Sequence, residues 1–376
     1  MCKVIGIDPG TRSFDICGIE DDHVYYEKII DTIDIAKNPG ILLKSIEDLF
    51  PLDLIVGPSG YGVPVTYLTN IPFDKVEDWY LTNILLLKKK DLENALKRGD
   101  IGIMVYYGMV KSAIEMKKRK WPVCYIPGVI HMPTVPKYRK FNKIDMGTAD
   151  KLSTAVLGVY DQSREYQIDY SEVSFILLEA GFGYNAAIAV YNGRIVDGVG
   201  GTSGGLGFLT IGSMDAELVQ LVGIWEKSDI FVGGASTISS KTDPRELEKC
   251  IDTDNRCYEA WQALIESNIK NVYSLLPSVN NKPREIILSG RLSRIKRFEE
   301  ELSTKLSKIA YVRKIGYLNG AKITKEAAQG YAIVACGLAG GYFEDLIDWM
   351  KIKEAYGTAI DYVVHPKKEL IRGLFR

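Results

Sequence analysis

Residues 4–20 read Val-Ile-Gly-Ile-Asp-Pro-Gly-Thr-Arg-Ser-Phe-Asp-Ile-Cys-Gly-Ile-Glu, and this stretch decides the fold. An apolar run ends at Asp8, and a second, alternating strand follows a short turn. The turn offers a bare backbone at Gly10 and hydroxyl donors at Thr11 and Ser13. The carboxylate of Asp8 is suited to holding a metal through water. We therefore predict a hairpin that binds an anion and a metal; an ordinary surface hairpin is the alternative.

The bulk properties are those of a soluble globular protein with two domains or two similar lobes. The chain has 376 residues, of which 46% are hydrophobic and 25% charged, with a formal net charge of -1. Near-neutral charge gives no reason to expect nucleic acid or an anionic membrane as a partner. Because no apolar run has the length of a membrane span and the first residues lead straight into a strand, we expect a cytoplasmic protein.

The cysteines and histidines do not form a recognisable site. The six cysteines are scattered without a Cys-x-x-Cys pair, at positions 2, 17, 124, 250, 257 and 336. We interpret most of them as small apolar residues in a reducing compartment. The three histidines lie far apart in the sequence, which argues against a metal site built from histidine.

Strands and helices alternate through the first part of the chain. The pattern predicts a third strand over residues 24–30, a helix that opens at Pro39-Gly40, and a buried strand over residues 53–57. A glycine-rich run at residues 58–62 follows that strand, where ligand loops lie in open α/β sheets. This run is a candidate substrate loop, and a plain turn is the alternative. Residues 74–120 are predicted to be helical.

A basic, proline-rich loop at residues 127–143 is the candidate acceptor site. It contains His131 and Arg139 and carries an excess of positive charge suited to a small anion, although a basic surface loop is an equal alternative. A helix running to about residue 160 follows, with Asp145 and Asp150 at its start. These carboxylates could serve an acceptor, or they could simply favour the helix N-terminus.

The pattern of the opening strands then repeats. A continuous apolar strand over residues 173–178 ends at Glu179, and a turn with Gly181 and Gly183 leads into two further strands. An acidic residue and glycines after the first strand of each half predict two related lobes that face one another across a cleft. We expect lobes at residues 1–165 and 166–350, and a basic tail at residues 351–376.

The glycine-rich loop at residues 200–207 is the most favourable phosphate site by composition. Glycine and hydroxyl residues dominate it, and a helix start follows at residues 212–215. The candidate phosphate-binding residues are Gly201, Thr202, Ser203, Gly204 and Gly205. The loop lacks the lysine of a P-loop and the ribose-binding acid of a dinucleotide site, and a flexible hinge is the alternative.

The final third is mostly helical. Two strands are predicted, over residues 285–288 and 311–315, and the first ends at Ser289 and Gly290. Small residues in a helix that opens at residues 327–330 imply close helix packing, as at a hinge between lobes.

These features together resemble the acetate and sugar kinase, heat-shock chaperone and actin superfamily. The resemblance rests on the two acid-glycine turns, the Ser-Gly after a late strand and the small-residue closing helix, and it covers nearly the whole chain in order. More narrowly, the chain is similar to a mainly archaeal family labelled as predicted butyrate kinases. The resemblance implies an α/β protein with two ribonuclease H-like lobes, the actin-like ATPase fold, and a cleft between them.

The resemblance also implies ATP and Mg²⁺ as cofactors. Asp8, Gly10, Thr11 and Ser13 would form the first phosphate turn, and Glu179, Gly181 and Gly183 the second. Gly290 would mark the turn beside the nucleoside. Asp8 and Glu179 would act together on one hydrated Mg²⁺.

The implied function is ATP- and Mg-dependent phosphoryl transfer to a small anionic or hydroxyl acceptor, such as a short-chain carboxylate. Asp145 or Asp150 would orient or deprotonate the acceptor, and His131 with Arg139 would screen charge on the transferred group. A homodimer would be compatible with this reading.

The chain departs from the superfamily pattern at three places. The second turn carries Glu179 and Phe182-Gly183-Tyr184, Gly290 precedes Arg291, and Thr210-Ile211 stands where acetate kinases have an arginine. An alternative function is therefore a non-catalytic nucleotide-dependent switch, or an ATPase that binds a protein partner. A third class, an ATPase that activates a radical dehydratase, would need cluster-ligating cysteines, and Cys250 and Cys257 alone fit that role poorly.

Overall fold

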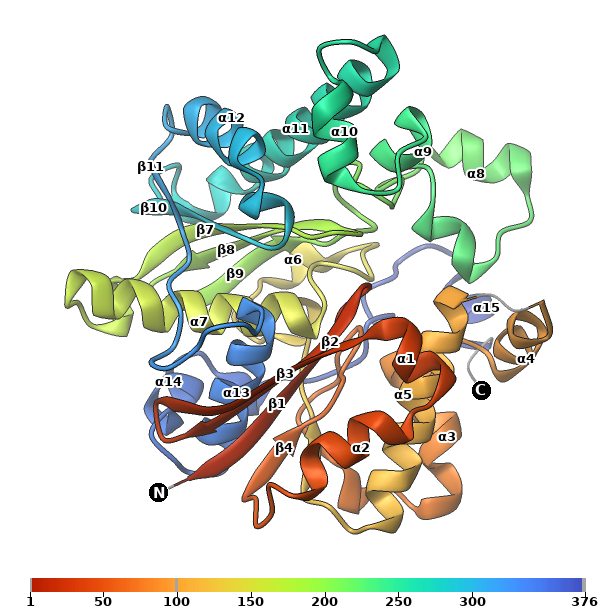
Figure 1. The fold of residues 1–376 in the computed structure, drawn as a ribbon, viewed down its shortest axis with the longest axis vertical. Coiled ribbons are helices and arrows are strands. Elements are labelled where there is room, and N and C mark those ends of the chain that lie inside the picture. Colours follow the sequence, from red (N-terminus) through yellow and green to blue (C-terminus); the bar gives the residue numbers. More distant parts are fainter. Residues whose placement is uncertain (1, 99–100, 374–376) are drawn as a thin grey trace. The chain divides into compact units, whose positions relative to one another are not determined.

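The computed structural model describes residues 2–98 and 101–373. Contacts within the chain divide it into two units. Unit 1 comprises residues 1–144, 148–161 and 317–376, and unit 2 comprises residues 145–147 and 162–316. Each unit contains one β-sheet with helices packed on it (Figure 1).

Unit 1 is built on a six-stranded sheet with the order β3-β2-β1-β4-β6-β5. The strands β1, β2 and β3 form an antiparallel meander, β4 and β6 continue it in parallel with β1, and β5 closes the edge antiparallel to β6. Their bounds are β1 Lys3–Pro9, β2 Ser13–Glu20, β3 His23–Asp31, β4 Leu54–Val56, β5 Thr66–Tyr67 and β6 Val123–Tyr125.

The helices of unit 1 cover this sheet, and the apolar strand residues form its core with them (Figure 1). Before α7 the bounds are α1 Thr32–Lys37, α2 Gly40–Glu47, η1 Leu68–Asn70, η2 Phe73–Lys75, α3 Val76–Trp79, η3 Tyr80–Ile84, α4 Lys89–Arg98, α5 Ile101–Lys118, η4 Val129–His131 and α6 Lys137–Lys140. The later elements are α7 Ala149–Tyr166, whose end belongs to unit 2, then α13 Glu326–Leu338, α14 Glu344–Trp349, η9 Ile352–Glu354 and α15 Lys368–Gly373.

The closing helix α13 packs directly on β1, and this contact explains why the units differ from the expected ranges. A Cβ atom on Gly6 of β1 would lie 2.3 Å from the backbone nitrogen of Ala332, so only glycine allows the helix to approach this closely. Gly330 of the same helix likewise approaches the backbone of Ser153 in α7. Residues 317–350 therefore belong to unit 1 by contact, instead of to a lobe spanning residues 166–350. The last three residues of the expected tail, 374–376, lie outside the described residues.

Unit 2 repeats the strand order on a five-stranded sheet, β11-β10-β7-β8-β9. The strands β7, β8 and β9 form an antiparallel meander, and β10 and β11 continue it in parallel with β7. The bounds are β7 Ser174–Ala180, β8 Asn185–Tyr191, β9 Arg194–Val199, β10 Glu285–Ser289 and β11 Tyr311–Lys314. This repetition confirms the prediction of two related α/β lobes.

The helices α8 to α12 of unit 2 come after the meander in the sequence, and η5 precedes it (Figure 1). Their bounds are η5 Tyr170–Glu172, α8 Ala216–Val222, η6 Lys227–Phe231, α9 Ala235–Ser239, α10 Pro244–Cys250, α11 Asn255–Leu275, η7 Leu276–Val279, η8 Leu292–Arg294 and α12 Lys296–Leu306. The long helix α11 buries an apolar face, including Trp261 and Leu264, against the sheet.

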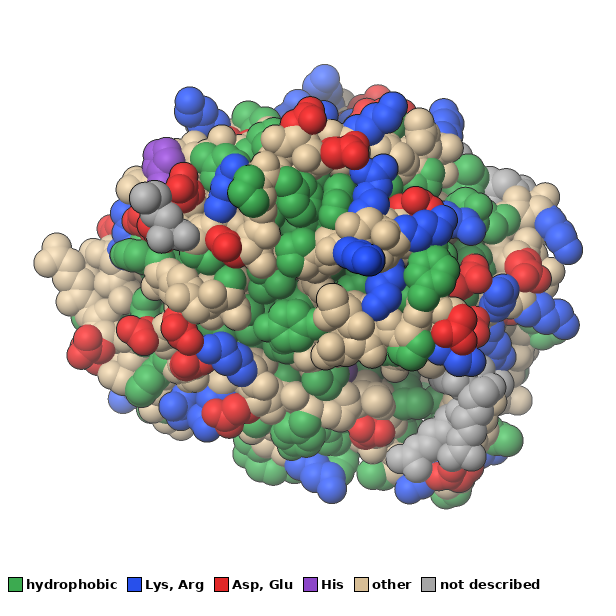
Figure 2. All heavy atoms as spheres, turned by 90° about the horizontal axis from the view of Figure 1, so that it is seen from below, with side chains coloured by type: hydrophobic (Ala, Val, Ile, Leu, Met, Phe, Trp, Pro, Cys, Tyr) green, Lys and Arg blue, Asp and Glu red, His purple; other side chains and the backbone are tan. Residues whose placement is uncertain are grey.

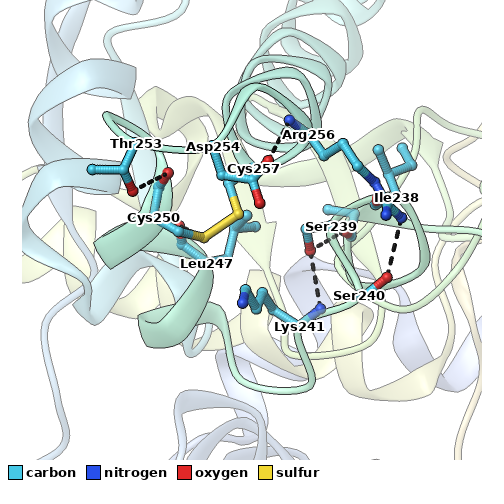
Figure 3. Close-up of a disulfide and its surroundings, with 11 residues drawn as sticks. Ile238, Ser239, Ser240, Lys241, Leu247, Cys250, Thr253, Asp254, Arg256 and Cys257 are labelled. Atoms are coloured by element: carbon cyan, nitrogen blue, oxygen red, sulfur yellow. Dashed lines mark hydrogen bonds between the residues drawn. A yellow bond between two sulfur atoms is a disulfide. The ribbon is translucent and has the colours of Figure 1, made fainter.

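A disulfide joins Cys250 at the end of α10 to Cys257 in the first turn of α11 (Figure 3). Arg256, in the same first turn, ties α11 to the end of α9, because its guanidinium donates to the carbonyl of Ile238 and to the hydroxyl of Ser240. These two cysteines are therefore neither isolated apolar residues nor cluster ligands, because both sulfurs are used in the bond. The other four cysteines are buried thiols, as expected.

The surface carries both signs of charge, interspersed over the face drawn in Figure 2. This matches a formal net charge of -1 from 47 basic and 48 acidic residues. Within residues 2–98 and 101–373, the structure has no helix with the length and apolar character needed to span a bilayer.

Candidate functional site

A buried ion pair that the sequence did not reveal lies beside the predicted first phosphate turn, residues 9–13. Asp8 ends the buried part of β1 and is 3% exposed. Its Oδ2 atom lies 2.6 Å from the Nζ atom of Lys325, which directly precedes α13. The carboxylate predicted to hold a metal is thus paired with an ammonium group from the far end of the chain.

Asp15 on β2 fixes Lys325 in this position. The backbone N–H of Lys325 donates to Asp15 Oδ2 at 3.0 Å, and its Nζ atom lies 3.4 Å from Asp15 Oδ1. The hydroxyl of Ser13, predicted to contact phosphate, donates to Asp15 instead. A Cβ atom on Gly10 would lie 2.2 Å from the lysine Nζ, so this glycine makes room for the ammonium group. Thr11 is exposed at the tip of the turn.

A second carboxylate–lysine pair lies at the start of α7. Asp150 accepts a hydrogen bond from the hydroxyl of Thr148, and its Oδ2 atom lies 2.6 Å from Lys151 Nζ. Burial alone would raise the pKa of Asp150. The positive charge of Lys151 and the hydrogen bonds from Lys151 and Thr148 outweigh this effect, so the pKa of Asp150 lies below its usual value. Burial raises the pKa of Asp8 despite the opposing charge of Lys325, and the negative charge of Asp150 adds to that rise. The two pairs therefore form one charged cluster in unit 1.

This cluster fits a hydrated Mg²⁺ better than a metal held by a protein cage. Within the described part of the chain, no three His, Cys, Asp or Glu side chains are grouped as metal ligands. Mg²⁺ usually keeps several waters and is held by one or two carboxylates together with substrate phosphates. Asp8 can supply one such carboxylate at the end of β1, so its donor set suits a metal that arrives with a phosphate ligand.

Loops at the carboxyl ends of β4 and β6 meet the start of α7 near these pairs. The hydroxyl of Ser59 accepts from the backbone N–H of Ile126 at 3.1 Å, and the N–H of Ala149 donates to the carbonyl of Gly60 at 3.0 Å. A Cβ atom on Gly62 would lie 2.0 Å from the backbone nitrogen of Gly128. The glycines of the predicted substrate loop thus serve close backbone packing within unit 1.

His131 is a buried neutral side chain, which conflicts with its predicted role as a cation. Its Nδ1 atom lies 3.2 Å from the backbone nitrogen of Gly128, within the short turn η4. Burial, with a smaller contribution from nearby Lys140, lowers the pKa of His131 to about 4. An imidazole with this pKa carries no charge at neutral pH and cannot screen an anion.

Acid should therefore destabilise unit 1 through His131. The folded protein resists protonation between pH 6.5 and about 4, whereas the unfolded chain accepts the proton, so stability falls as the pH drops through this window. At pH 4 we expect a loss of about 3 kcal/mol from this residue alone. Urea unfolding at pH 7 and pH 4.5 should show a smaller pH effect in His131→Gln than in the wild type. Equal pH dependence in the two proteins would contradict the assignment.

Arg139 and Lys140 occupy different environments in the basic loop. The Arg139 guanidinium lies 5.6 Å from the ring centre of Tyr138, and the residue is partly exposed. Lys140 is fully buried; its Nζ atom donates to the carbonyl of Met132 at 2.8 Å and lies 4.7 Å from the ring centre of Tyr362. Burial lowers the pKa of Lys140 to about 8. The sequence did not single out Lys140, because there it is only one of several basic residues in the loop.

In unit 2, the second acid-glycine turn and the late-strand turn are brought together. Glu179 at the end of β7 pairs in register with Ser289 at the end of β10. Gly290 has a φ of 87°, and a Cβ atom there would lie 2.4 Å from the carbonyl oxygen of Ala180. The N–H of Gly181 donates to the carbonyl of Tyr184 at 2.9 Å and tightens the turn, and the carbonyl of Gly183 accepts from residues 209 and 210. The structure therefore places these two turns next to one another in unit 2.

The glycine-rich loop at residues 200–207 does not present an open phosphate cradle. Asp145 takes the place of the expected anion: its Oδ2 atom accepts from both the N–H and the hydroxyl of Thr202, each at 3.1 Å. The hydroxyl of Ser203 donates to the carbonyl of Asp145 at 2.6 Å, and the N–H of Gly205 donates to Asn271. A Cβ atom on Gly200 would lie 1.8 Å from Asp145 Oδ1.

Two predicted roles change as a result. Asp145 anchors a loop of unit 2, so it is not placed to deprotonate an acceptor, and Gly204 donates its N–H to Gly200 within the loop. Gly201 packs on the ring of Tyr184, where a Cβ atom would lie 2.3 Å from Cδ1. The loop's glycines are explained by close internal packing.

Comparison with known proteins identifies relatives by fold. Residues 6–365 match the profile of a family described as "Protein of unknown function (DUF1464)". No curated protein sequence matches the chain. Among solved structures, an acetate kinase from Porphyromonas gingivalis is similar with a TM-score of 0.58 and 13% identity, covering 88% of this chain and 94% of its own.

Two further kinases share this architecture. A propionate kinase from Francisella tularensis subsp. tularensis SCHU S4 is similar with a TM-score of 0.58 and 13% identity, covering 88% of this chain and 98% of its own. The acetate kinase from Entamoeba histolytica is similar with a TM-score of 0.55 and 14% identity, and the match covers 81% of this chain and 86% of the acetate kinase. At these identities the likeness establishes the fold, which is that of the actin-like ATPases with two ribonuclease H-like lobes, as the sequence predicted.

Proposed function

We propose that the chain, which belongs to the family described as "Protein of unknown function (DUF1464)", is an ATP- and Mg-dependent phosphotransferase acting on a short-chain carboxylate. The observation that carries the proposal is the buried pair formed by Asp8, near the end of β1, and Lys325, which precedes α13. A carboxylate and an ammonium group at this point supply a ligand for hydrated metal and a partner for phosphate.

Phosphoryl transfer depends mainly on positioning and on neutralising charge. When bound with ATP, Mg²⁺ would neutralise charge on the phosphate oxygens. In unit 1, Asp8 would hold the water shell of the metal, and the exposed hydroxyl of Thr11 would donate to a phosphate oxygen. In unit 2, the carboxylate of Glu179 would contact the water shell of a hydrated Mg²⁺, the turn at Gly181 and Gly183 would bind nucleotide phosphate, and Gly290 would lie on the nucleoside side.

The charges around Asp150 favour a carboxylate acceptor over a hydroxyl. A hydroxyl must lose its proton to a general base, and such a base works best with a pKa near the operating pH. The pKa of Asp150 is lowered, which makes it a poor base. A carboxylate is already ionised and needs no base, so the site suits an acid of short chain length. Arg139 would attract its negative charge.

Two measurements test the proposal. Thermal unfolding with millimolar ATP, ADP or GTP and Mg²⁺ should show a raised melting temperature, because a ligand at 100 times its Kd stabilises the native state by about 2.7 kcal/mol. Acetate, propionate and butyrate should then each be incubated with MgATP and hydroxylamine. The formation of a hydroxamate from one of these acids would report an acyl phosphate. Absence of both a thermal shift and a hydroxamate would overturn the proposal.

A second candidate is a nucleotide-dependent switch that binds a protein partner. None of the seven described residues of α8 is buried, although Leu218, Leu221 and Val222 lie on it. Exposed apolar side chains of this kind mark interaction surfaces. Nucleotide binding without hydroxamate formation, combined with a nucleotide-dependent loss of α8 exposure in the presence of a partner, would favour this function.

A further inference from the structure

We infer that Lys325 is the phosphate-binding cation of unit 1 and that Asp15 positions it. This inference rests on the proposed function, because it names the group that receives the phosphate in that site. Thr210-Ile211 stands where the acetate kinases that this chain resembles have an arginine, so the cation of the proposed transfer has to come from elsewhere.

The ammonium group of Lys325 lies on the turn predicted to contact phosphate. Its Nζ atom is 2.6 Å from Asp8 Oδ2 and 3.4 Å from the carbonyl oxygen of Ser13. It is also 2.2 Å from the position that a Gly10 Cβ would take, so it fills the space that this glycine leaves open. The lysine side chain is 14% exposed, so it is not sealed from solvent as the Asp15 side chain is.

Asp15 has the contacts of a positioning residue. It is fully buried and contacts Lys325 twice, through the backbone N–H and through the ammonium group. Its other partner is the hydroxyl of Ser13, at the end of the same turn. The carboxylate thus ties the start of α13 to the turn, and the lysine cannot leave it without breaking these bonds.

The charge balance predicts a reciprocal effect on metal binding. Lys325 forms ion pairs with both Asp8 and Asp15 when no metal is bound, so it competes with a divalent cation for Asp8. Removing the ammonium group should weaken binding of a bare polyphosphate and strengthen binding of Mg²⁺ alone. A lysine that served only the packing of the turn would not produce this opposite pair of changes.

The test uses the full chain and isothermal titration with two probes, tripolyphosphate in the presence of EDTA and Mg²⁺ alone. In Lys325→Met we expect at least a tenfold loss of affinity for tripolyphosphate and at least a threefold gain for Mg²⁺. Lys322→Met is the matched control, since Lys322 is exposed on the same segment, and it should bind both probes as the wild type does. Tripolyphosphate affinity within twofold of the wild type in Lys325→Met, or no binding by the wild type, would overturn the inference.

A second variant guards against loss of folding. If Lys325→Met does not fold, the double variant Asp8→Asn/Lys325→Met removes both charges of the pair and should show the same tenfold loss for tripolyphosphate. Retained affinity there would contradict the inference. The phosphotransferase proposal can fail on its own. Tripolyphosphate binding that depends on Lys325, without hydroxamate formation, would contradict the proposed function and support the inference about Lys325. Hydroxamate formation at the wild-type rate in Lys325→Met would support the proposed function and contradict the inference.

Discussion

Glu285→Gln is expected to lower the free energy of unfolding of unit 2 by about 3 to 5 kcal/mol, the cost of breaking a buried ion pair from one side. Glu285 begins β10 and is fully buried. Its two carboxylate oxygens each lie 2.7 Å from a nitrogen of Arg313 on β11, one Nε and one Nη2. Gln162 and Tyr166 donate to the same carboxylate at 2.7 and 3.0 Å. The substitution leaves the arginine largely buried without its counter-charge.

Urea unfolding followed by tryptophan fluorescence, to which the buried Trp261 of unit 2 contributes, measures this loss. The control is Glu266→Gln, because Glu266 forms an exposed pair with Lys270 one helical turn away. Exposed pairs of this kind contribute little, so the control should unfold at the wild-type midpoint. If Glu285→Gln also unfolds there, the buried network does not stabilise unit 2.

The repeated meander was predictable because its signals are local. Alternation of apolar residues and glycine turns predicted β1 to β3 and again β7 to β9, and both sets form with antiparallel pairing. The same logic located the helix that became α7, which extends to Tyr166 instead of ending near residue 160. Fold class follows from such patterns, because each strand or helix must bury its own apolar face.

The ion pair between Asp8 and Lys325 in unit 1 could not be predicted from local sequence patterns. Asp8 and Lys325 are 317 residues apart, and nothing near Lys325 distinguishes it from other lysines. The small residues of α13 were recognised, but they indicate only close packing and do not say which strand is packed. Once α13 is known to lie on β1, the lysine before it must fall near Asp8.

The glycine-rich loop shows a different kind of limit. Glycine and hydroxyl residues suit any anion, and the sequence cannot tell a bound phosphate from an internal carboxylate. Asp145, expected to act on the acceptor, is the anion that Thr202 contacts in the structure. The disulfide between Cys250 and Cys257 could not be predicted either, because it depends on how α10 and α11 meet.

Asp8→Asn is expected to lower kcat/KM for the proposed transfer by about 100-fold or more, the scale of losing one preorganised electrostatic group. The amide removes the charge that Lys325 neutralises and that a hydrated metal would need. Asp15 still pairs with Lys325 in this variant, so the ammonium group keeps a counter-charge and the protein should lose less stability than Glu285→Gln does. Hydroxamate formation from butyrate, measured over a range of Mg²⁺ concentrations, gives the result. Asp34→Asn, on the exposed side of α1, is the control and should match the wild type.

Asp150→Asn then separates the two classes of acceptor. A general base contributes about 10² to 10⁴ in rate, so a hydroxyl acceptor would make this substitution nearly as severe as the one at Asp8. A short-chain acid needs no base, and with it we expect less than a tenfold loss, arising from the broken contacts to Thr148 and Lys151. A severe loss with butyrate would mean that Asp150 does more than hold Lys151. Full activity in both variants would move the reaction away from unit 1's charged cluster altogether, since no chemistry that uses Asp8 tolerates its neutralisation.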